Sequence, residues 1–166
     1  MNWIKSYFLL LALCLSSFSF GQVECTSDVT IGEGTSISMC ANALESLTAS
    51  SGYVSYAWSG PETATGAVIT PNFSGQYVVA ATDGVGCVSH DTIQVTINPA
   101  PVDAIISSEG DTICPGVSST TLSLSNSYIL YDWGGGQSNP TIDVSTTGTY
   151  SVDVADANGC VGTFSF

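Results

Sequence analysis

The sequence predicts an all-β protein made of two tandem antiparallel β-sandwiches that follow a signal peptide. Three observations lead to this prediction. Short runs alternate apolar and polar side chains, turn-forming Gly, Pro, Asn and Ser separate those runs, and one order of landmark residues occurs twice. Thr, Val and Tyr, which favour strands, are abundant after residue 22, whereas the helix formers Lys, Arg, Gln and Leu are scarce there.

Residues 1–21 have the composition of a secretory signal peptide. Lys5 supplies a positive charge, the apolar run over 7–15 is too short to span a bilayer, and Ser19 and Gly21 are the small residues that precede a cleavage site. No second apolar span follows. The sequence therefore predicts no membrane insertion after signal cleavage, and a secreted or cell-surface, extracellular location.

The rest of the chain is acidic. The whole chain carries 14 Asp and Glu against one Lys, for a net charge of −13, and that Lys lies in the signal peptide. Binding of nucleic acid or of an anionic membrane surface needs Lys and Arg, so both classes of partner are excluded. Two interpretations of the acidity remain: attraction of cations such as calcium, and, more simply, a surface kept soluble by its own charge.

One unit is repeated with small changes in loop length. Four landmarks recur after 73 to 75 residues: Cys40 and Cys114, Trp58 and Trp133, Tyr77 and Tyr150, Cys87 and Cys160. These repeats predict a first domain over 22–98, a proline linker over 99–101, and a second domain over 102–166. Since fewer residues follow the last landmark in the second copy, we expect that domain to lack part of its final strand.

Strand parity predicts which side chains face each core, because alternate residues of a strand share a face. In the first unit the inward set is Val54, Tyr56, Trp58, Tyr77, Val79, Ile93, Val95 and Ile97. In the second unit it is Ile129, Tyr131, Trp133, Tyr150, Val152 and Val154. We therefore expect Trp58, Tyr77, Trp133 and Tyr150 to be structural residues of the two cores.

Cysteine spacing suggests a cross-link for each unit. A unit of about 70 residues buries a small hydrophobic core and is only marginally stable by itself, and disulfides commonly stabilise exported domains of this size. The sequence predicts the pairs Cys40–Cys87 and Cys114–Cys160, each worth roughly 4 kcal/mol. Metal ligation is the alternative, but the chain has no Cys-x-x-Cys motif and one His. Cys25 remains, either free or bonded to another chain or to another part of the protein.

The order Cys, Tyr-x-Trp, Gly-x-Tyr resembles that of immunoglobulin-like sandwiches. Trp58 and Trp133 fall where the core tryptophan of strand C would be, and Tyr77 and Tyr150 fall at the position of the tyrosine corner. The resemblance extends over residues from about 35 to 166 and implies an Ig-like fold.

The chain departs from the immunoglobulin pattern at its second cysteine. Val79 and Val152 occupy that position, and the cysteines come later, in an Asp-x-x-Gly-Cys turn. This pattern, with the "YDWGGG" motif at 131–136, resembles the Ig-like and PKD-like repeats of bacterial secreted and cell-surface proteins, many of them exported by the type IX route. The resemblance implies structural or adhesive modules.

Three sets of residues have the side-chain types of a functional site. Ser89, His90 and Asp91 are adjacent on a predicted strand, so their side chains alternate between faces and cannot form a catalytic triad. A weak calcium site would use the oxygen ligands of Asp153, Asp156 and Asn158, against a plain Asx turn as the simpler interpretation. A glycan platform would use the aromatic residues outside the inward set, which are Tyr53, Phe73 and Tyr128.

The sequence thus favours a non-catalytic extracellular module, with no catalytic residue and no required cofactor. Tandem Ig-like repeats would act as a spacer or binding scaffold of a bacterial surface or secreted protein. The alternative is a pair of accessory domains, which could bind carbohydrate, in a larger secreted hydrolase. The expected partners are glycans or other surface proteins, together with downstream domains of a longer chain.

Overall fold

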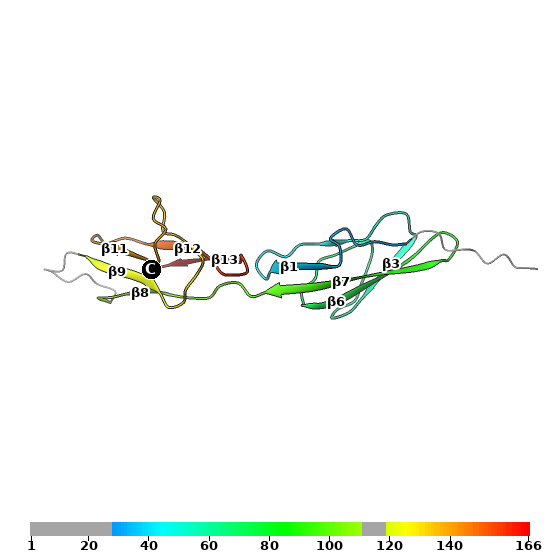
Figure 1. The fold of residues 1–166 in the computed structure, drawn as a ribbon, viewed down its shortest axis with the longest axis horizontal. Coiled ribbons are helices and arrows are strands. Elements are labelled where there is room, and N and C mark those ends of the chain that lie inside the picture. Colours follow the sequence, from blue (N-terminus) through cyan, green and yellow to red (C-terminus); the bar gives the residue numbers. More distant parts are fainter. Residues whose placement is uncertain (1–27, 111–118) are drawn as a thin grey trace, which may run out of the picture.

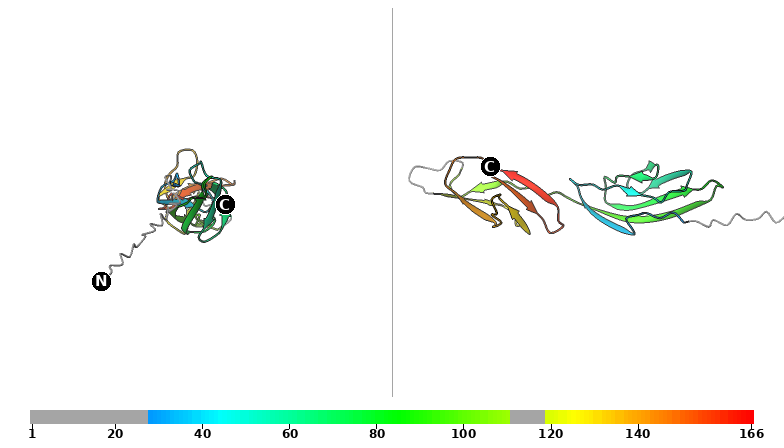
Figure 2. Two further views of the ribbon diagram at one scale, coloured as in Figure 1. Left: turned by 90° about the vertical axis from the view of Figure 1, so that its right-hand side faces the viewer. Right: turned by 90° about the horizontal axis from the view of Figure 1, so that it is seen from above.

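The computed structural model describes residues 28–110 and 119–166, which form β-strands and turns and contain no helix. The all-β prediction is confirmed. The strands lie in two units, unit 1 (28–98) and unit 2 (102–166), placed end to end (Figure 1). Two further views show that the pair is long and narrow (Figure 2).

Unit 1 is a sandwich of two sheets. Its strands are β1 (Ser36–Cys40), β2 (Leu47–Thr48), β3 (Ser55–Ser59), β4 (Ala64–Thr65), β5 (Val68–Ile69), β6 (Gly75–Thr82) and β7 (Val88–Asn98). The larger sheet has the order β1-β7-β6-β3-β4, and the smaller pairs β2 with β5. All pairs are antiparallel except that of β1, which runs parallel to the end of β7 and places Cys40 opposite Asn98.

Unit 2 is a sandwich of two three-stranded antiparallel sheets. Its strands are β8 (Ile105–Ser107), β9 (Thr120–Leu124), β10 (Leu130–Asp132), β11 (Thr141–Val144), β12 (Ser151–Ala155) and β13 (Val161–Ser165). The sheet orders are β10-β12-β13 and β11-β9-β8. The final strand, β13, has 5 residues, whereas its counterpart β7 has 11.

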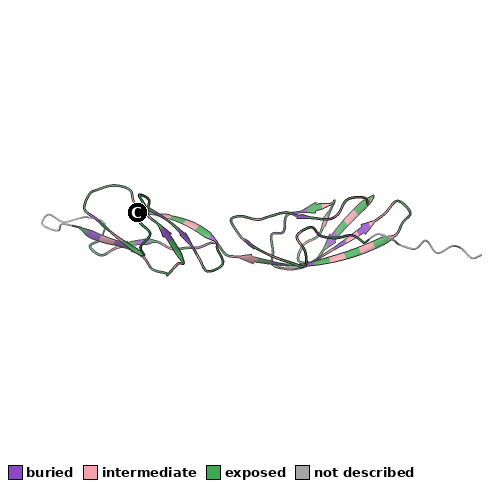
Figure 3. Ribbon diagram, turned by 45° about the horizontal axis from the view of Figure 1, so that its top comes forward, coloured by how far each residue is buried: buried purple, intermediate pink, exposed green. Residues whose placement is uncertain are grey.

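Each unit has its own hydrophobic core, and the two cores share no residue. Trp58 and Tyr77 are fully enclosed in the first, whereas Trp133 and Tyr150 are half-buried against the second. Exposed residues alternate with half-buried or buried ones along the long β7, as Figure 3 shows. This is the pattern expected of a strand with one face on a core.

Two residues predicted to face inward do not. Val54 and Ile129 are each 71% exposed. Each immediately precedes its strand, since β3 begins at Ser55 and β10 at Leu130. Parity fixes a side chain only within a paired strand, so it does not hold for these two positions.

The fold is Ig-like in its landmark contacts as well as its layers. Tyr77 Oη donates to the Phe73 carbonyl at 3.0 Å, and Tyr150 Oη donates to the Thr146 carbonyl at 2.7 Å. Both are tyrosine corners, in which a hydroxyl ties a strand to the backbone a few residues upstream. In the part of the chain that the structure describes, no helix is long and apolar enough to cross a membrane.

Candidate functional site

A disulfide joins the two units where they meet. Cys40, at the end of β1, is bonded to Cys160, which directly precedes β13, and the two Cα atoms are 5.5 Å apart. The bond spans 120 residues of sequence. Figure 1 shows β1 and β13 facing one another at this junction.

The predicted pairing within each unit is therefore wrong. Cys40 lies beside the last residue of β7, and Cys87 precedes the first. The 11 residues of β7 separate those ends by roughly 35 Å, whereas a disulfide needs Cα atoms within about 7 Å. Cys87 is disulfide-bonded, but not to Cys40. Cys25 and Cys114 lie outside the described residues.

An Asx turn holds Cys160 in place. Asp156 Oδ1 accepts hydrogen bonds from the backbone N–H groups of Asn158 at 2.8 Å and Cys160 at 2.9 Å. Asp83 makes the same two bonds to Val85 and Cys87 in unit 1, both at 2.9 Å. The Asp-x-x-Gly-Cys motif is thus a rigid turn that presents a cysteine at one end of its unit.

The two carboxylates of the weak calcium candidate both accept hydrogen bonds within unit 2. One oxygen of Asp156 is used by the turn, and Asp153 accepts a hydrogen bond from Thr163 Oγ1 at 2.6 Å on the neighbouring strand. Across residues 28–110 and 119–166, no three His, Cys, Asp or Glu side chains come together as metal ligands would. The Asx turn, which was the simpler interpretation, is what the structure contains.

Two further contacts support the disulfide at the junction. Asn42 Nδ2, in the turn after β1, donates to the Val161 carbonyl at 2.8 Å across 119 residues of sequence. Gly162 lies against the linker, where a Cβ atom would come within 3.0 Å of Pro101 Cβ. A covalent bond, a hydrogen bond and a close packing contact therefore converge where the units meet.

Ser89, His90 and Asp91 alternate between faces, as the strand geometry requires. Ser89 Oγ and Asp91 Oδ2 accept from the backbone N–H groups of Val29 and Ile31, at 3.0 and 2.7 Å. His90 lies between them in β7 and is exposed. These polar side chains dock the first described segment onto β7 and do not form a triad.

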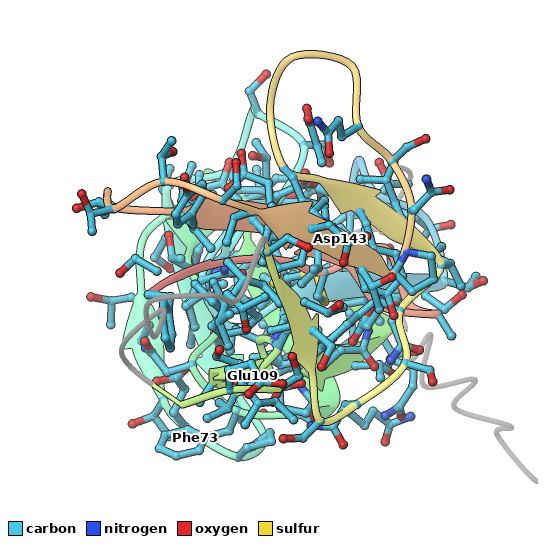
Figure 4. All side chains as sticks on the ribbon, turned by 90° about the vertical axis from the view of Figure 1, so that its left-hand side faces the viewer. Phe73, Glu109 and Asp143 are labelled. Carbon is cyan, nitrogen blue, oxygen red and sulfur yellow. A yellow bond between two sulfur atoms is a disulfide. The ribbon has the colours of Figure 1, made fainter. Side chains whose placement is uncertain are left out.

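The aromatic residues expected to be platforms are mostly occupied in packing. Tyr53 stacks edge-on against Tyr56 with ring centroids 5.9 Å apart, and Tyr128 stacks against Tyr131 at 6.0 Å. Tyr128 Oη also donates to Asp103 at 3.2 Å. Phe73 alone of the three is mainly exposed, at 58%, and lies at the periphery in Figure 4.

A groove on unit 2 is lined by aromatic, aliphatic and polar side chains. It has a volume of about 270 Å³, and its lining includes Trp133, Gln137, Ile142, Asp143, Thr146 and Tyr150. Trp133 and Gln137 come from the loop after β10, which stands out from the sandwich (Figure 1). Asp143 belongs to β11 and is labelled in Figure 4. The groove lies beside the edges of the two sheets, where β10 and β11 pair with no further strand of the described residues.

Glycines shape the loop above the groove. Gly134, Gly135 and Gly136 have φ angles of 82°, 61° and 84°, a run of left-handed residues that side chains strongly disfavour. The turn is closed by hydrogen bonds between Trp133 N–H and the Gln137 carbonyl at 3.0 Å and between Gln137 N–H and the Gly134 carbonyl at 3.2 Å. The Trp133 indole is fixed separately, because Nε1 donates to the Asn139 carbonyl at 3.0 Å.

Unit 1 has no open groove beside Trp58, the residue that corresponds to Trp133, in the part that the structure describes. There β4 pairs with β3, with Ala64 opposite Trp58, and no such strand pairs with β10 among the described residues. Glu62 Oε1 accepts from Tyr77 Oη at 2.9 Å and covers the tyrosine corner. Burial, reinforced by Glu62, raises the pKa of Tyr77 to about 12. Trp58 is accordingly only 2% exposed.

Sequence reasoning missed Asn42, Gln137 and Asp143 as site residues, and it assigned Trp133 and Tyr150 to the core. The signal that bears on the groove is the difference between the two copies: the loop after Trp133 has a run of glycines where the loop after Trp58 has a short strand. The junction left no such signal. Its partners are 119 and 120 residues apart and meet only in the folded chain.

Comparison with known proteins gives structural similarity only. No protein family and no curated protein matches the sequence. One solved structure with a similar fold is the Bacteroides ovatus mixed-linkage glucan utilization locus protein SGBP-B in complex with a mixed-linkage heptasaccharide; it is 15% identical, the match covers 83% of this chain and 46% of that one, and the TM-score is 0.35. Another is the N-terminal four Ig domains of Dscam1 isoform 1.9, which is 16% identical, with 79% of this chain and 42% of that one covered and a TM-score of 0.31. This chain thus spans less than half the length of either, and its own strand order and tyrosine corners are what make it Ig-like.

Proposed function

We propose that this protein is a non-catalytic extracellular scaffold whose two Ig-like units form a stiff rod that holds a binding element away from its point of attachment. The observation that supports this most directly is the Cys40–Cys160 bond between the units. Two Ig-like units joined by a linker alone would be expected to move relative to one another. A bond at the junction, with Asn42 and Gly162 beside it, opposes that motion.

The proposal includes the compartment and the kind of protein. The signal peptide at 1–21 and the disulfides suit an oxidising, extracellular location. The resemblance to PKD-like repeats suits a bacterial surface or secreted protein exported by the type IX route. We also propose 22–98 and 102–166 as separately folding domains, and a non-enzymatic role, since Ser89 and Asp91 serve docking and His90 lies exposed between them.

The rod is tested by comparing the oxidised protein with the double variant Cys40→Ser/Cys160→Ser in small-angle X-ray scattering. The oxidised protein should give one extended shape that a single conformer fits. The variant should retain its β-sheet circular dichroism but require a broad ensemble of angles between the units. Identical scattering from two folded samples would show that the disulfide does not stiffen the chain, and the scaffold proposal would fail.

A further inference from the structure

We propose that the groove on unit 2 is a binding site for a neutral saccharide, with Trp133 as the apolar surface and Gln137 and Asp143 as hydrogen-bonding groups. This goes beyond the scaffold role and does not depend on it, because the groove lies within unit 2 and not at the junction. A volume of about 270 Å³ suits one or two sugar rings and is near the lower end of small-molecule sites.

The apolar part of the site is preorganised. The Trp133 indole is half-buried and oriented by its hydrogen bond to the Asn139 carbonyl, so its N–H is already used. What it can offer a ligand is ring surface, against which the C–H faces of a sugar can pack. Tyr150 is held similarly, with Oη 2.7 Å from the Thr146 carbonyl and 3.1 Å from Thr146 Oγ1.

The polar part of the site has unused hydrogen-bonding capacity. The Gln137 side chain makes no hydrogen bond to any residue that the structure describes, and Ser145 Oγ makes none either. Asp143 Oδ1 accepts from Thr121 Oγ1, which orients the carboxylate, while its second oxygen has no partner within the described ranges. The Trp133 indole is thus surrounded by an amide, a carboxylate oxygen and a hydroxyl that can form hydrogen bonds. This combination matches a saccharide, in which hydroxyls alternate with C–H groups.

The charge of the chain and the residues of the groove limit the class of ligand further. With no Lys or Arg after residue 5, the site has no counterion for an acidic sugar or a phosphate. A proline-rich peptide would need several aromatic rings in a row, whereas the lining of this groove has two aromatic residues, Trp133 and Tyr150, interspersed with polar side chains. A neutral saccharide is the ligand class that these residues suit best.

Unit 1 provides the internal control. Its Trp58 is sealed by β4, and the tyrosine corner is covered by Glu62. A hollow on the described part of that unit, about 330 Å³ in volume, is lined by Thr30, Gly32, Thr48, Ala49, Ser50 and Ser51, none of which is aromatic. The same fold therefore carries one tryptophan that a ligand can reach and one that it cannot.

The test uses the full secreted chain, labelled with ¹⁵N, and follows its two indole N–H signals by NMR. The probes are hexasaccharides of β-glucan, xylan, mannan and chitin, with polygalacturonate and a proline-rich peptide for comparison. At least one neutral hexasaccharide should shift the Trp133 signal saturably and leave Trp58 unmoved. Gln137→Ala and Asp143→Ala should each weaken binding about tenfold, while Gln76→Ala, an exposed glutamine on β6 of unit 1, should not.

Several results would overturn the proposal. The first is that no neutral saccharide shifts the Trp133 signal. The second is that the folded Gln137→Ala and Asp143→Ala proteins bind the saccharide as tightly as the unaltered protein. The third is that only polygalacturonate or the peptide shifts the Trp133 signal. The Cys40→Ser/Cys160→Ser protein separates this question from the scaffold role, because its saccharide affinity should equal that of the oxidised protein even where its scattering differs.

Discussion

Tyr77 and Glu62 show how one side chain decides whether a tyrosine corner is open. Tyr77 donates to Glu62 Oε1 and to the Phe73 carbonyl, and it is fully buried. Glu62 is held in turn by Asn72, whose backbone N–H donates to Glu62 Oε1 at 2.8 Å and keeps the pKa of the carboxyl below its ordinary value. Among the described residues, no carboxylate accepts a hydrogen bond from Tyr150 Oη, and Tyr150 lines the groove.

The raised pKa of Tyr77, about 12 in the folded protein, predicts a loss of stability at alkaline pH. Because the unfolded tyrosine ionises near pH 10, its contribution is complete below pH 10 and is lost as the pH rises towards 12. In urea unfolding of unit 1, the midpoint should fall across this range. Tyr77→Phe should cost about 1 kcal/mol at pH 8 and flatten the alkaline decline, whereas Tyr150→Phe should leave that decline unchanged.

Asp103 predicts the opposite pH dependence for unit 2. Burial by itself raises the pKa of this carboxyl, but hydrogen bonds from the backbone N–H groups of Asn126, Ala104 and Ser125 outweigh burial and keep the pKa below its ordinary value. A lowered folded pKa gives stability that is present above the unfolded pKa and is lost as the pH falls through the folded one.

The variant Asp103→Asn should therefore lower the stability of unit 2 by about 1–3 kcal/mol at pH 7. The backbone N–H groups of Ser125 and Asn126 donate to different carboxylate oxygens of Asp103, whereas an amide has only one acceptor oxygen. The urea midpoint of the variant should also change less between pH 7 and pH 3 than that of the unaltered protein. Asp153→Asn, on the exposed side of β12, serves as the control. Equal acid sensitivity of the two variants would contradict the assignment.

At the scale of the element, the Asp-x-x-Gly-Cys turn does the same work in both units. It reverses the chain between β6 and β7 in unit 1 and between β12 and β13 in unit 2, and one aspartate oxygen accepts two backbone N–H bonds in each. The turn therefore fixes the position from which its cysteine can reach a partner.

Asp156→Ala should destabilise the turn and slow formation of the junction disulfide. Two backbone N–H groups would lose their acceptor, at a cost of about 1–2 kcal/mol to unit 2. Oxidative refolding followed by peptide mapping should show a slower appearance of the Cys40–Cys160 peptide pair. Asp156→Asn, which keeps an acceptor oxygen, should restore most of the rate, and a rate unaffected by either change would contradict this role.

Much of the strand content could be predicted because it depends on local pattern. The alternation along 93–97 and 77–79 places Ile93, Val95, Tyr77 and Val79 on the core, as expected. The groove could not be predicted, because the strands that lead to Trp58 and Trp133 have the same local pattern, and the glycine run after Trp133 does not by itself show that a groove forms. What differs is whether the segment after the tryptophan returns as β4 to cover it or leaves as a glycine-rich loop.

At the scale of the molecule, the junction disulfide should couple the unfolding of the two units. A cross-link that closes a loop of 120 residues restricts the unfolded chain by roughly 4–5 kcal/mol in the chain-entropy account. Calorimetry of the oxidised protein should show one broadened or merged transition, and Cys40→Ser/Cys160→Ser should show two separate ones, with at least one at lower temperature. Two unchanged transitions in both proteins would indicate no coupling.

The sequence by itself determined that the chain is β-structured and repeated, because alternation, turn residues and recurring landmark residues can be recognised along the chain. It could not determine which cysteines meet, since that depends on which ends of the strands face each other: Cys87 and Cys40 lie at opposite ends of β7, while the β12–β13 turn brings Cys160 to Cys40. Tertiary structure likewise decided that one of two equivalent tryptophans is sealed and the other borders a groove, because its cover comes from a segment beyond its own strand.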